Sequence, residues 1–272
     1  MREFFGYGGY TREPEGYMSW QHLTFVTSLM VIMVALAVFL GMKNRIKDEK
    51  IKNKVVIASA ILIDAFELIK IVVYMTRSDD PATAWHNLLP LFLCSIQLIT
   101  IPLAAFAKGR VKESALDFVF IFGILGAVTG TYGAGQNYSC YPVLSMDNVI
   151  SGITHAISGF ASLYIVISGM ASMKKKNIPI LFGILFGFCA AALTANLTLG
   201  TNYMFLMAGD GTPYDIFYNM VNGNAVIYPI IVMALFVVYI SIFQIIFNYC
   251  ANKKATNNTA NEDAPTLETV AK

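Results

Sequence analysis

The segment Val55–Met75, VVIASAILIDAFELIKIVVYM, is apolar over a length that suits one crossing of a lipid bilayer. It carries three charged residues, Asp64, Glu67 and Lys70, at every third position. On a helix this spacing places them along one side, each turned about 60° from the one before. An ionised side chain at the centre of a bilayer costs about 3 kcal/mol or more, so such residues usually face a protein interior or a water-filled cavity. The segment therefore predicts a helical membrane protein with a polar site inside the bilayer.

The composition of the whole chain supports this interpretation. Hydrophobic residues make up 56% of the sequence and charged residues only 13%, and the mean hydropathy is +0.60. These values exclude an ordinary soluble domain. The apolar runs are continuous rather than alternating, which favours helices over the strands of a transmembrane barrel. We therefore predict an all-α integral membrane protein, a seven-transmembrane-helix bundle, with spans at 18–41, 55–75, 86–106, 115–131, 149–172, 180–200 and 225–250.

Basic residues mark one side of the predicted membrane domain. They follow the first, third, fifth and seventh spans, in runs that include Lys43, Lys108, Lys174 and Lys253. The positive-inside rule then places the N-terminus outside and the C-terminus in the cytoplasm. We expect a multi-pass protein of the cell membrane with a short extracytoplasmic segment (1–17), a membrane domain (18–250) and a disordered cytoplasmic tail (251–272). The basic residues are not interleaved with exposed aromatic residues, so the sequence predicts no nucleic-acid partner.

Polar and reactive groups gather in the outer half of the predicted bundle. At about 1.5 Å per helical residue, five spans bring such groups to roughly 6–12 Å below the outer helix ends. These groups are His22, Glu67, Cys94, His155 and Asn196. Cys94 and His155 form the chemically suggestive pair, because an imidazole beside a thiol favours the nucleophilic thiolate.

Neighbouring groups complete the predicted site. Glu67 is expected either to hold the histidine or to pair with Lys70 at i,i+3 on its own helix. Gln97, one helical turn below Cys94, would donate to an oxyanion. Each residue also has a structural interpretation. A cysteine in an apolar helix is often a small core residue, a membrane histidine often hydrogen-bonds a neighbouring helix, and opposite charges can compensate one another inside a bundle.

Several stretches carry a resemblance to a known family: LLPLFLCSIQL (88–98), SWQHL (19–23), His155, and TNYMFL (201–206) with Pro213 after it. They resemble the YwaF-like family of bacterial integral membrane proteins, whose third helix carries an LPLHLC-type motif. That family is similar to a eukaryotic transmembrane acyltransferase that moves polyunsaturated acyl chains onto ether lysophospholipids. The resemblance implies a cysteine-centred acyl transfer at Cys94 and His155. Phe92 stands where the family motif has histidine, and on a regular helix positions 92 and 94 point about 160° apart.

Two functions from different classes follow. The first is a cysteine-dependent phospholipid acyltransferase or acyl hydrolase, with membrane phospholipid as its partner and without a metal or cofactor. The alternative is a proton- or ion-coupled small-solute transporter or a membrane substrate-binding subunit, because intramembrane charges commonly mark ion pathways. The expected catalytic residues are Cys94, His155 and Glu67, and the expected substrate-binding residues are His22, Asp64, Lys70, Gln97, Asn196, Asn202 and Tyr203.

Overall fold

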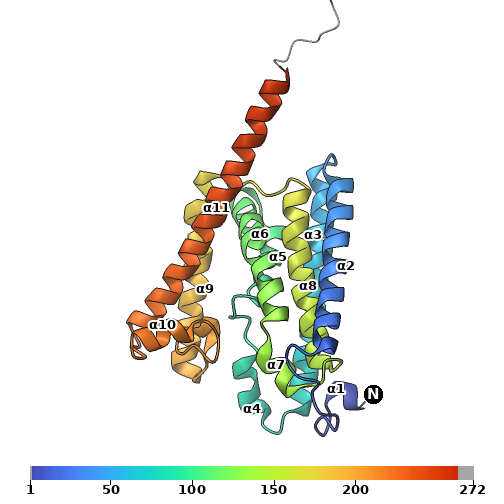
Figure 1. The fold of residues 1–272 in the computed structure, drawn as a ribbon, viewed down its shortest axis with the longest axis vertical. Coiled ribbons are helices and arrows are strands. Elements are labelled where there is room, and N and C mark those ends of the chain that lie inside the picture. Colours follow the sequence, from blue (N-terminus) through green and yellow to red (C-terminus); the bar gives the residue numbers. More distant parts are fainter. Residues whose placement is uncertain (1, 263–272) are drawn as a thin grey trace, which may run out of the picture.

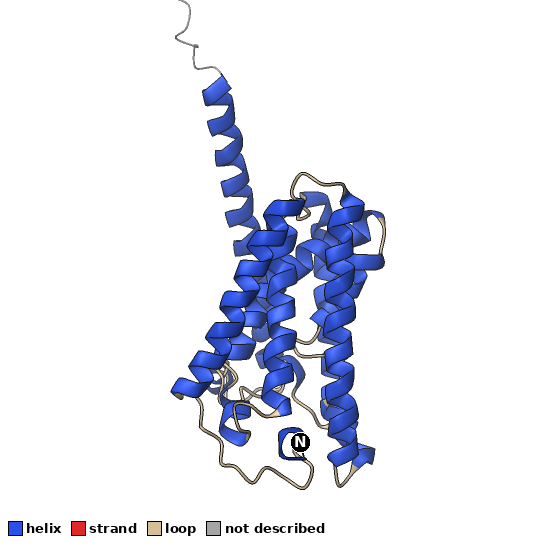
Figure 2. Cartoon of the chain, turned by 90° about the vertical axis from the view of Figure 1, so that its right-hand side faces the viewer, coloured by secondary structure: helices blue, strands red, loops and turns tan. Residues whose placement is uncertain are grey.

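The computed structural model describes the backbone of residues 2–262 and the side chains of residues 2–251. Within these residues the chain is helical and has no strand, so the all-α prediction is confirmed (Figures 1 and 2). The helices are α1 (Arg2–Phe5), α2 (Trp20–Asn44), α3 (Glu49–Arg77), α4 (Pro81–Ala84), α5 (Gln97–Phe106), α6 (Gly109–Tyr132), α7 (Gly135–Cys140), α8 (Met146–Ile167), α9 (Ile178–Leu199), α10 (Asp215–Met220) and α11 (Ile227–Glu262). Three short 3-10 turns join them: η1 (Trp85–Asn87), η2 (Lys175–Asn177) and η3 (Tyr203–Phe205).

Five helical segments of the described chain are long and apolar enough to cross a membrane. They are Trp20–Asn44, Gly109–Cys140, Met146–Ile167, Lys175–Leu199 and Ile227–Ala251. A multi-pass membrane protein is therefore confirmed. The two remaining predicted spans differ from these five, because α3 has 29 residues but carries charges along its length, and α5 has only 10 residues. The backbone of α11 continues to Glu262, past the expected boundary at residue 250, and residues 263–272 of the expected tail lie outside the described residues.

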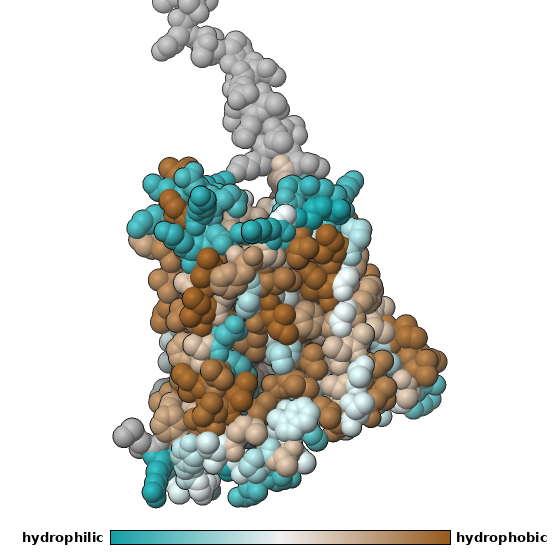
Figure 3. Space-filling model, turned by 180° about the vertical axis from the view of Figure 1, so that it is seen from behind, coloured by the Kyte–Doolittle hydropathy of each residue, from teal (hydrophilic) through white to brown (hydrophobic). Residues whose placement is uncertain are grey.

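The main bundle consists of α2, α3, α5, α6 and α8, with α6 and α8 packed against each other (Figure 1). Its apolar core includes Ile63 of α3, Ile101 of α5, Val119 of α6 and Ile165 of α8, each almost completely buried. The same bundle exposes a band of apolar side chains between two hydrophilic ends (Figure 3). A lipid bilayer covers such a band, because its interior offers no water to the residues that face it.

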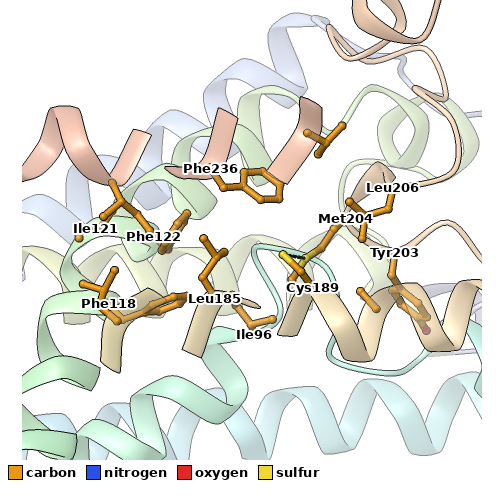
Figure 4. Close-up of a cluster of buried hydrophobic side chains, with 14 of the residues drawn as sticks. Ile96, Phe118, Ile121, Phe122, Leu185, Cys189, Tyr203, Met204, Leu206 and Phe236 are labelled. Atoms are coloured by element: carbon orange, nitrogen blue, oxygen red, sulfur yellow. Dashed lines mark hydrogen bonds between the residues drawn. The ribbon is translucent and has the colours of Figure 1, made fainter. Parts of the chain in front are cut away.

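Helices α9 and α11 pack beside the main bundle through a second apolar cluster (Figure 4). In this cluster Phe118 and Phe122 of α6 meet Leu185 of α9 and Phe236 of α11. Cys189 lies in the same cluster, with its Sγ atom 3.8 Å from the Sδ atom of Met204. Cys189 is thus a core residue.

The predicted third span, 86–106, is not one helix. It consists of η1, a non-helical stretch from Leu88 to Ile96, and then α5. Pro90 explains the interruption in part, because proline has no N–H to donate and clashes with a preceding helical turn. Irregular backbone at membrane depth is tolerated only where it is buried in protein or lines a cavity. The helical depth count for Cys94 and the 160° angle between positions 92 and 94 therefore rested on a geometry that this segment does not adopt.

Candidate functional site

A cavity of about 310 Å³ lies between α3, the non-helical stretch 88–96, α7 and α8. Along α3 it extends from Ile63 to Tyr74, which corresponds to about 16 Å of helix. Along α8 it extends from Asp147 to His155, or about 12 Å. The non-helical stretch thus lines a cavity, as irregular backbone at membrane depth requires.

The cavity brings together the two residues that the sequence singled out as reactive. Cys94 and His155 both line it. Nδ1 of His155 lies 2.7 Å from the carbonyl oxygen of Ser151. Because a carbonyl only accepts, Nδ1 carries the proton of the neutral imidazole and Nε2 has a free lone pair. Nε2 is buried and forms no hydrogen bond with any of the described residues. It therefore remains available to accept a proton from the thiol.

Two glycines of α6, one turn apart, form the surface against which this pair rests. A Cβ atom at Gly130 would lie 2.0 Å from Nε2 of His155. A Cβ atom at Gly126 would lie 3.3 Å from the Cα atom of Cys94. Because these positions have no side chains, there is room for the imidazole, and the cysteine backbone can approach α6. The sequence shows the glycine spacing, but it does not show which residues occupy the space.

Glu67 and Lys70 form an ion pair in the same cavity. Oε1 of Glu67 lies 2.6 Å from Nζ of Lys70, at the i,i+3 spacing that the sequence allowed. The glutamate therefore neutralises the lysine, and Ser151 rather than Glu67 is the partner of His155 Nδ1. A paired charge at membrane depth avoids the cost of an isolated one.

The end of the cavity near Asp147 is tied to the N-terminal segment. Arg77 and Asp147 form a two-bond ion pair, with Nη1 2.7 Å from Oδ2 and Nη2 2.5 Å from Oδ1. The Tyr10 hydroxyl donates to Oδ2 at 2.6 Å, and Arg77 donates to the carbonyl oxygen of Phe5 at 3.1 Å. Burial, together with the hydrogen bond to Asp147, raises the pKa of Tyr10 to about 12. The N-terminal segment thus covers this end of the bundle through contacts that sequence spacing does not reveal.

The sequence model of the TMEM164 family matches residues 17–252. The chain belongs to the TMEM164 family. The match includes the five membrane-spanning segments as well as Cys94 and His155. No curated protein and no solved structure shows a significant match to the chain. Family membership and the apolar helices together identify a multi-pass membrane protein.

Three of the predicted binding residues of this TMEM164 family member lie outside the cavity. Asp64 is exposed on α3, and it forms no ion pair among the described residues. His22 is fully buried, with Nε2 3.1 Å from the carbonyl oxygen of Thr131 and Nδ1 accepting from Met18 N at 3.2 Å. Gln97 is also fully buried, and its Oε1 accepts from Thr100 at 3.0 Å. His22 and Gln97 therefore make the contacts of structural residues.

Of the seven predicted binding residues, Lys70 lines the cavity. The remaining three, Asn196, Asn202 and Tyr203, build the connection between α9 and α10. Asn196 accepts from Tyr203 N at 2.6 Å and donates to the Tyr203 carbonyl oxygen at 3.0 Å. Asn202 accepts from Met207 N at 2.9 Å. None of the three lines the cavity, but Tyr203 contacts the stretch that carries Cys94.

Proposed function

We propose that this protein is a cysteine-dependent acyltransferase or acyl hydrolase that acts on membrane phospholipid. The observation that carries the proposal is that Cys94 and His155 line one cavity at membrane depth, both against the glycine surface of α6, and that Nε2 of the histidine has no hydrogen-bond partner among the described residues. A thiol beside an imidazole whose tautomer is fixed by a third group is the arrangement of an activated nucleophile. Here the third group is the carbonyl oxygen of Ser151.

The first half-reaction transfers the acyl group to the enzyme. Nε2 of His155 takes the thiol proton, and Sγ of Cys94 forms a bond to the carbonyl carbon of an acyl ester. The bond between this carbon and the glycerol oxygen then breaks. The imidazolium returns the proton to that oxygen, and a lysophospholipid leaves with an acyl thioester remaining on Cys94.

The second half-reaction restores the thiol. The hydroxyl of an acceptor lysophospholipid, or water, loses its proton to Nε2 and attacks the thioester carbon. The carbon–sulfur bond breaks, and the thiolate regains the proton from the imidazolium. Acceptance by a lysophospholipid gives acyl transfer, and acceptance by water gives hydrolysis.

Backbone N–H groups beside the cysteine supply an anchor for the oxyanion. In the described structure, the N–H groups of Leu93, Cys94 and Ser95 donate to no acceptor. Free backbone donors next to a nucleophile stabilise the negative charge that develops on the carbonyl oxygen. This role, which the sequence assigned to Gln97, passes to the turn itself because Gln97 does not line the cavity.

The depth of the pair suits an ester substrate. His155 lies about 12 Å along α8 from Asp147, at the end of the bundle that carries the N-terminus. Phospholipid esters lie at the boundary between headgroups and hydrocarbon, several ångströms below the membrane surface. With the N-terminus outside the cell, as the basic loops predict, the donor lipid would come from the outer leaflet of the cell membrane.

The test is acyl transfer by the purified protein in lipid nanodiscs. Labelled phospholipid and lysophospholipid are supplied, intact mass reports the acyl thioester, and lipid mass spectrometry reports the product. We expect both signals from the wild type and neither from Cys94→Ala, whereas Cys189→Ala, which removes a core thiol, retains them. An active Cys94→Ala variant, or a folded wild type without thioester or product, contradicts the proposal.

The Glu67–Lys70 pair favours a second candidate function, coupled transport of a small solute or proton. Intramembrane ion pairs in cavities are common on such pathways. In proteoliposomes, transport of this kind would survive Cys94→Ala and fail in the double variant Glu67→Gln, Lys70→Met, which removes both charges together. The opposite pattern supports the acyltransferase.

A further inference from the structure

We propose that Tyr203 is a positioning residue that holds the non-helical stretch 88–96 in the shape that brings Cys94 to His155. The inference rests on the proposed acyl transfer and extends it to a residue remote in sequence. Tyr203 is 1% exposed and does not line the cavity. It therefore acts on the chain that carries the nucleophile and has no contact with substrate.

The Tyr203 hydroxyl replaces a backbone hydrogen bond that Pro90 removes. In a continuous helix, the carbonyl oxygen of His86 would accept from the N–H of residue 90. Proline has no N–H. The Tyr203 hydroxyl donates to this carbonyl oxygen at 2.5 Å and accepts from Leu89 N at 3.0 Å. One side chain thus satisfies both backbone groups at the point where the helical path is broken.

The Tyr203 ring holds the other end of the same stretch. Its centroid lies 4.9 Å from that of Phe92, and the Phe205 ring lies 6.0 Å from Phe92. Phe92 begins the turn that contains Cys94, because its carbonyl oxygen accepts from Ile96 N at 3.0 Å. Tyr203 therefore fixes the backbone before Pro90 through its hydroxyl and the start of the cysteine turn through its ring.

Tyr203 is itself anchored to α9. The side chain of Asn196, 3% exposed, pairs with both the N–H and the carbonyl oxygen of Tyr203. The next two residues, Met204 and Phe205, each have a φ of 55°, a conformation that costs free energy in residues other than glycine. Figure 4 shows Tyr203 and Met204 in the apolar cluster that also contains Cys189 and Ile96. The segment 203–205, whose first two residues are 1% exposed, thus holds the cysteine turn in a fixed position relative to α9.

Tyr203→Phe tests the inference, because it keeps the ring and removes only the hydroxyl. Tyr228→Phe is the matched control: Tyr228 is 1% exposed in the same cluster, and its hydroxyl has no partner among the described residues. Two quantities are measured in nanodiscs, the steady-state acyl-transfer kinetics and the pH profile of Cys94 alkylation by iodoacetamide, followed on the Cys94 peptide. The His155→Ala variant supplies the reference profile for a cysteine without its imidazole.

We expect Tyr203→Phe to lower kcat about ten- to hundredfold, as small misplacements of a reacting group do, with KM changed less than about twofold. Its alkylation profile should move toward that of His155→Ala, and Tyr228→Phe should match the wild type in both measurements. A folded Tyr203→Phe with the wild-type alkylation profile overturns the inference, whatever its activity. If this variant does not fold, Asn196→Ala is judged by the same two measurements. Alkylation does not require acyl transfer, so failure of the proposed function and failure of the positioning role are distinguishable.

Discussion

Replacement of Gly130 by alanine should impair the proposed catalytic pair, Cys94 and His155, without destabilising the bundle. Alanine in a helix interior is favoured over glycine by about 0.8–1.0 kcal/mol. The new Cβ atom would lie 2.0 Å from Nε2 of His155, whereas an ordinary contact needs about 3.5 Å. The imidazole must therefore move by roughly 1.5 Å, at a rotamer cost of about 0.5–1.5 kcal/mol. These contributions nearly cancel, so we expect the free energy of unfolding to stay within about 1 kcal/mol of the wild type.

The same displacement should be severe for catalysis. A misplacement of about 1 Å at a reacting group can reduce the rate about a hundredfold, and we expect a loss of at least that size. The assay is single-turnover formation of the Cys94 thioester by intact mass, beside thermal unfolding of the same sample. Gly187→Ala is the control, because a Cβ atom at Gly187 meets nothing within 4 Å; it should keep full activity. A wild-type rate in Gly130→Ala, or a loss of activity that accompanies unfolding of the bundle, would refute this account of the glycine surface.

Three further predictions concern the surroundings of the site. The folded-state pKa of Tyr10, about 12, lies above the ordinary value of about 10, so its contribution to stability is complete below pH 10 and is lost as the pH rises to 12. The free energy of unfolding should fall across that range, and the fall should be smaller in Tyr10→Phe; an equal fall in this variant would contradict the assignment. Asp64→Asn should leave acyl transfer unchanged, because Asp64 is exposed outside the cavity, and a loss of transfer would assign the residue to the reaction. Ser151→Ala should change the rate of acyl transfer less than about twofold. The reason is that Nδ1 of His155 lies 2.7 Å from the Ser151 carbonyl oxygen, which alanine retains, and 3.4 Å from the hydroxyl. A loss comparable to that of His155→Ala would show that the hydroxyl fixes the tautomer.

The features predicted correctly from the sequence are those that one helix, or the composition of the whole chain, determines. Apolar runs identify membrane helices because each helix must be apolar over the thickness of the bilayer and must form its own backbone hydrogen bonds. The i,i+3 spacing on a single helix made the Glu67–Lys70 pair one of the two alternatives for Glu67, and the structure contains this pair at 2.6 Å. The pairing of Cys94 with His155 was inferred from matched depths and a family resemblance, and the structure places both in one cavity, although the helix used to count the depth of Cys94 does not exist.

What the sequence did not reveal depends on contacts between distant elements. Arg77 and Asp147 are 70 residues apart, and the Tyr203 hydroxyl meets a backbone group 114 residues away. No periodicity within one segment reports such contacts. Asn196 was expected to bind substrate because polar groups at membrane depth suggest a site, and Tyr203 belongs to the TNYMFL stretch that carries the family resemblance. In the structure, the polar atoms of both side chains pair with backbone groups.

The interruption at Pro90 connects these observations to the chemistry. In a regular transmembrane helix, each N–H donates to the carbonyl oxygen four residues earlier, so a cysteine there has no free backbone donor beside it. The stretch 88–96 leaves the N–H groups of Leu93, Cys94 and Ser95 without acceptors among the described residues. Unsatisfied backbone groups are costly in a membrane, and the Tyr203 hydroxyl removes that cost at His86 and Leu89 while the cysteine turn keeps its donors free. Under the proposed function, a broken helix is therefore what allows a thiol at membrane depth to have both a base and an oxyanion site.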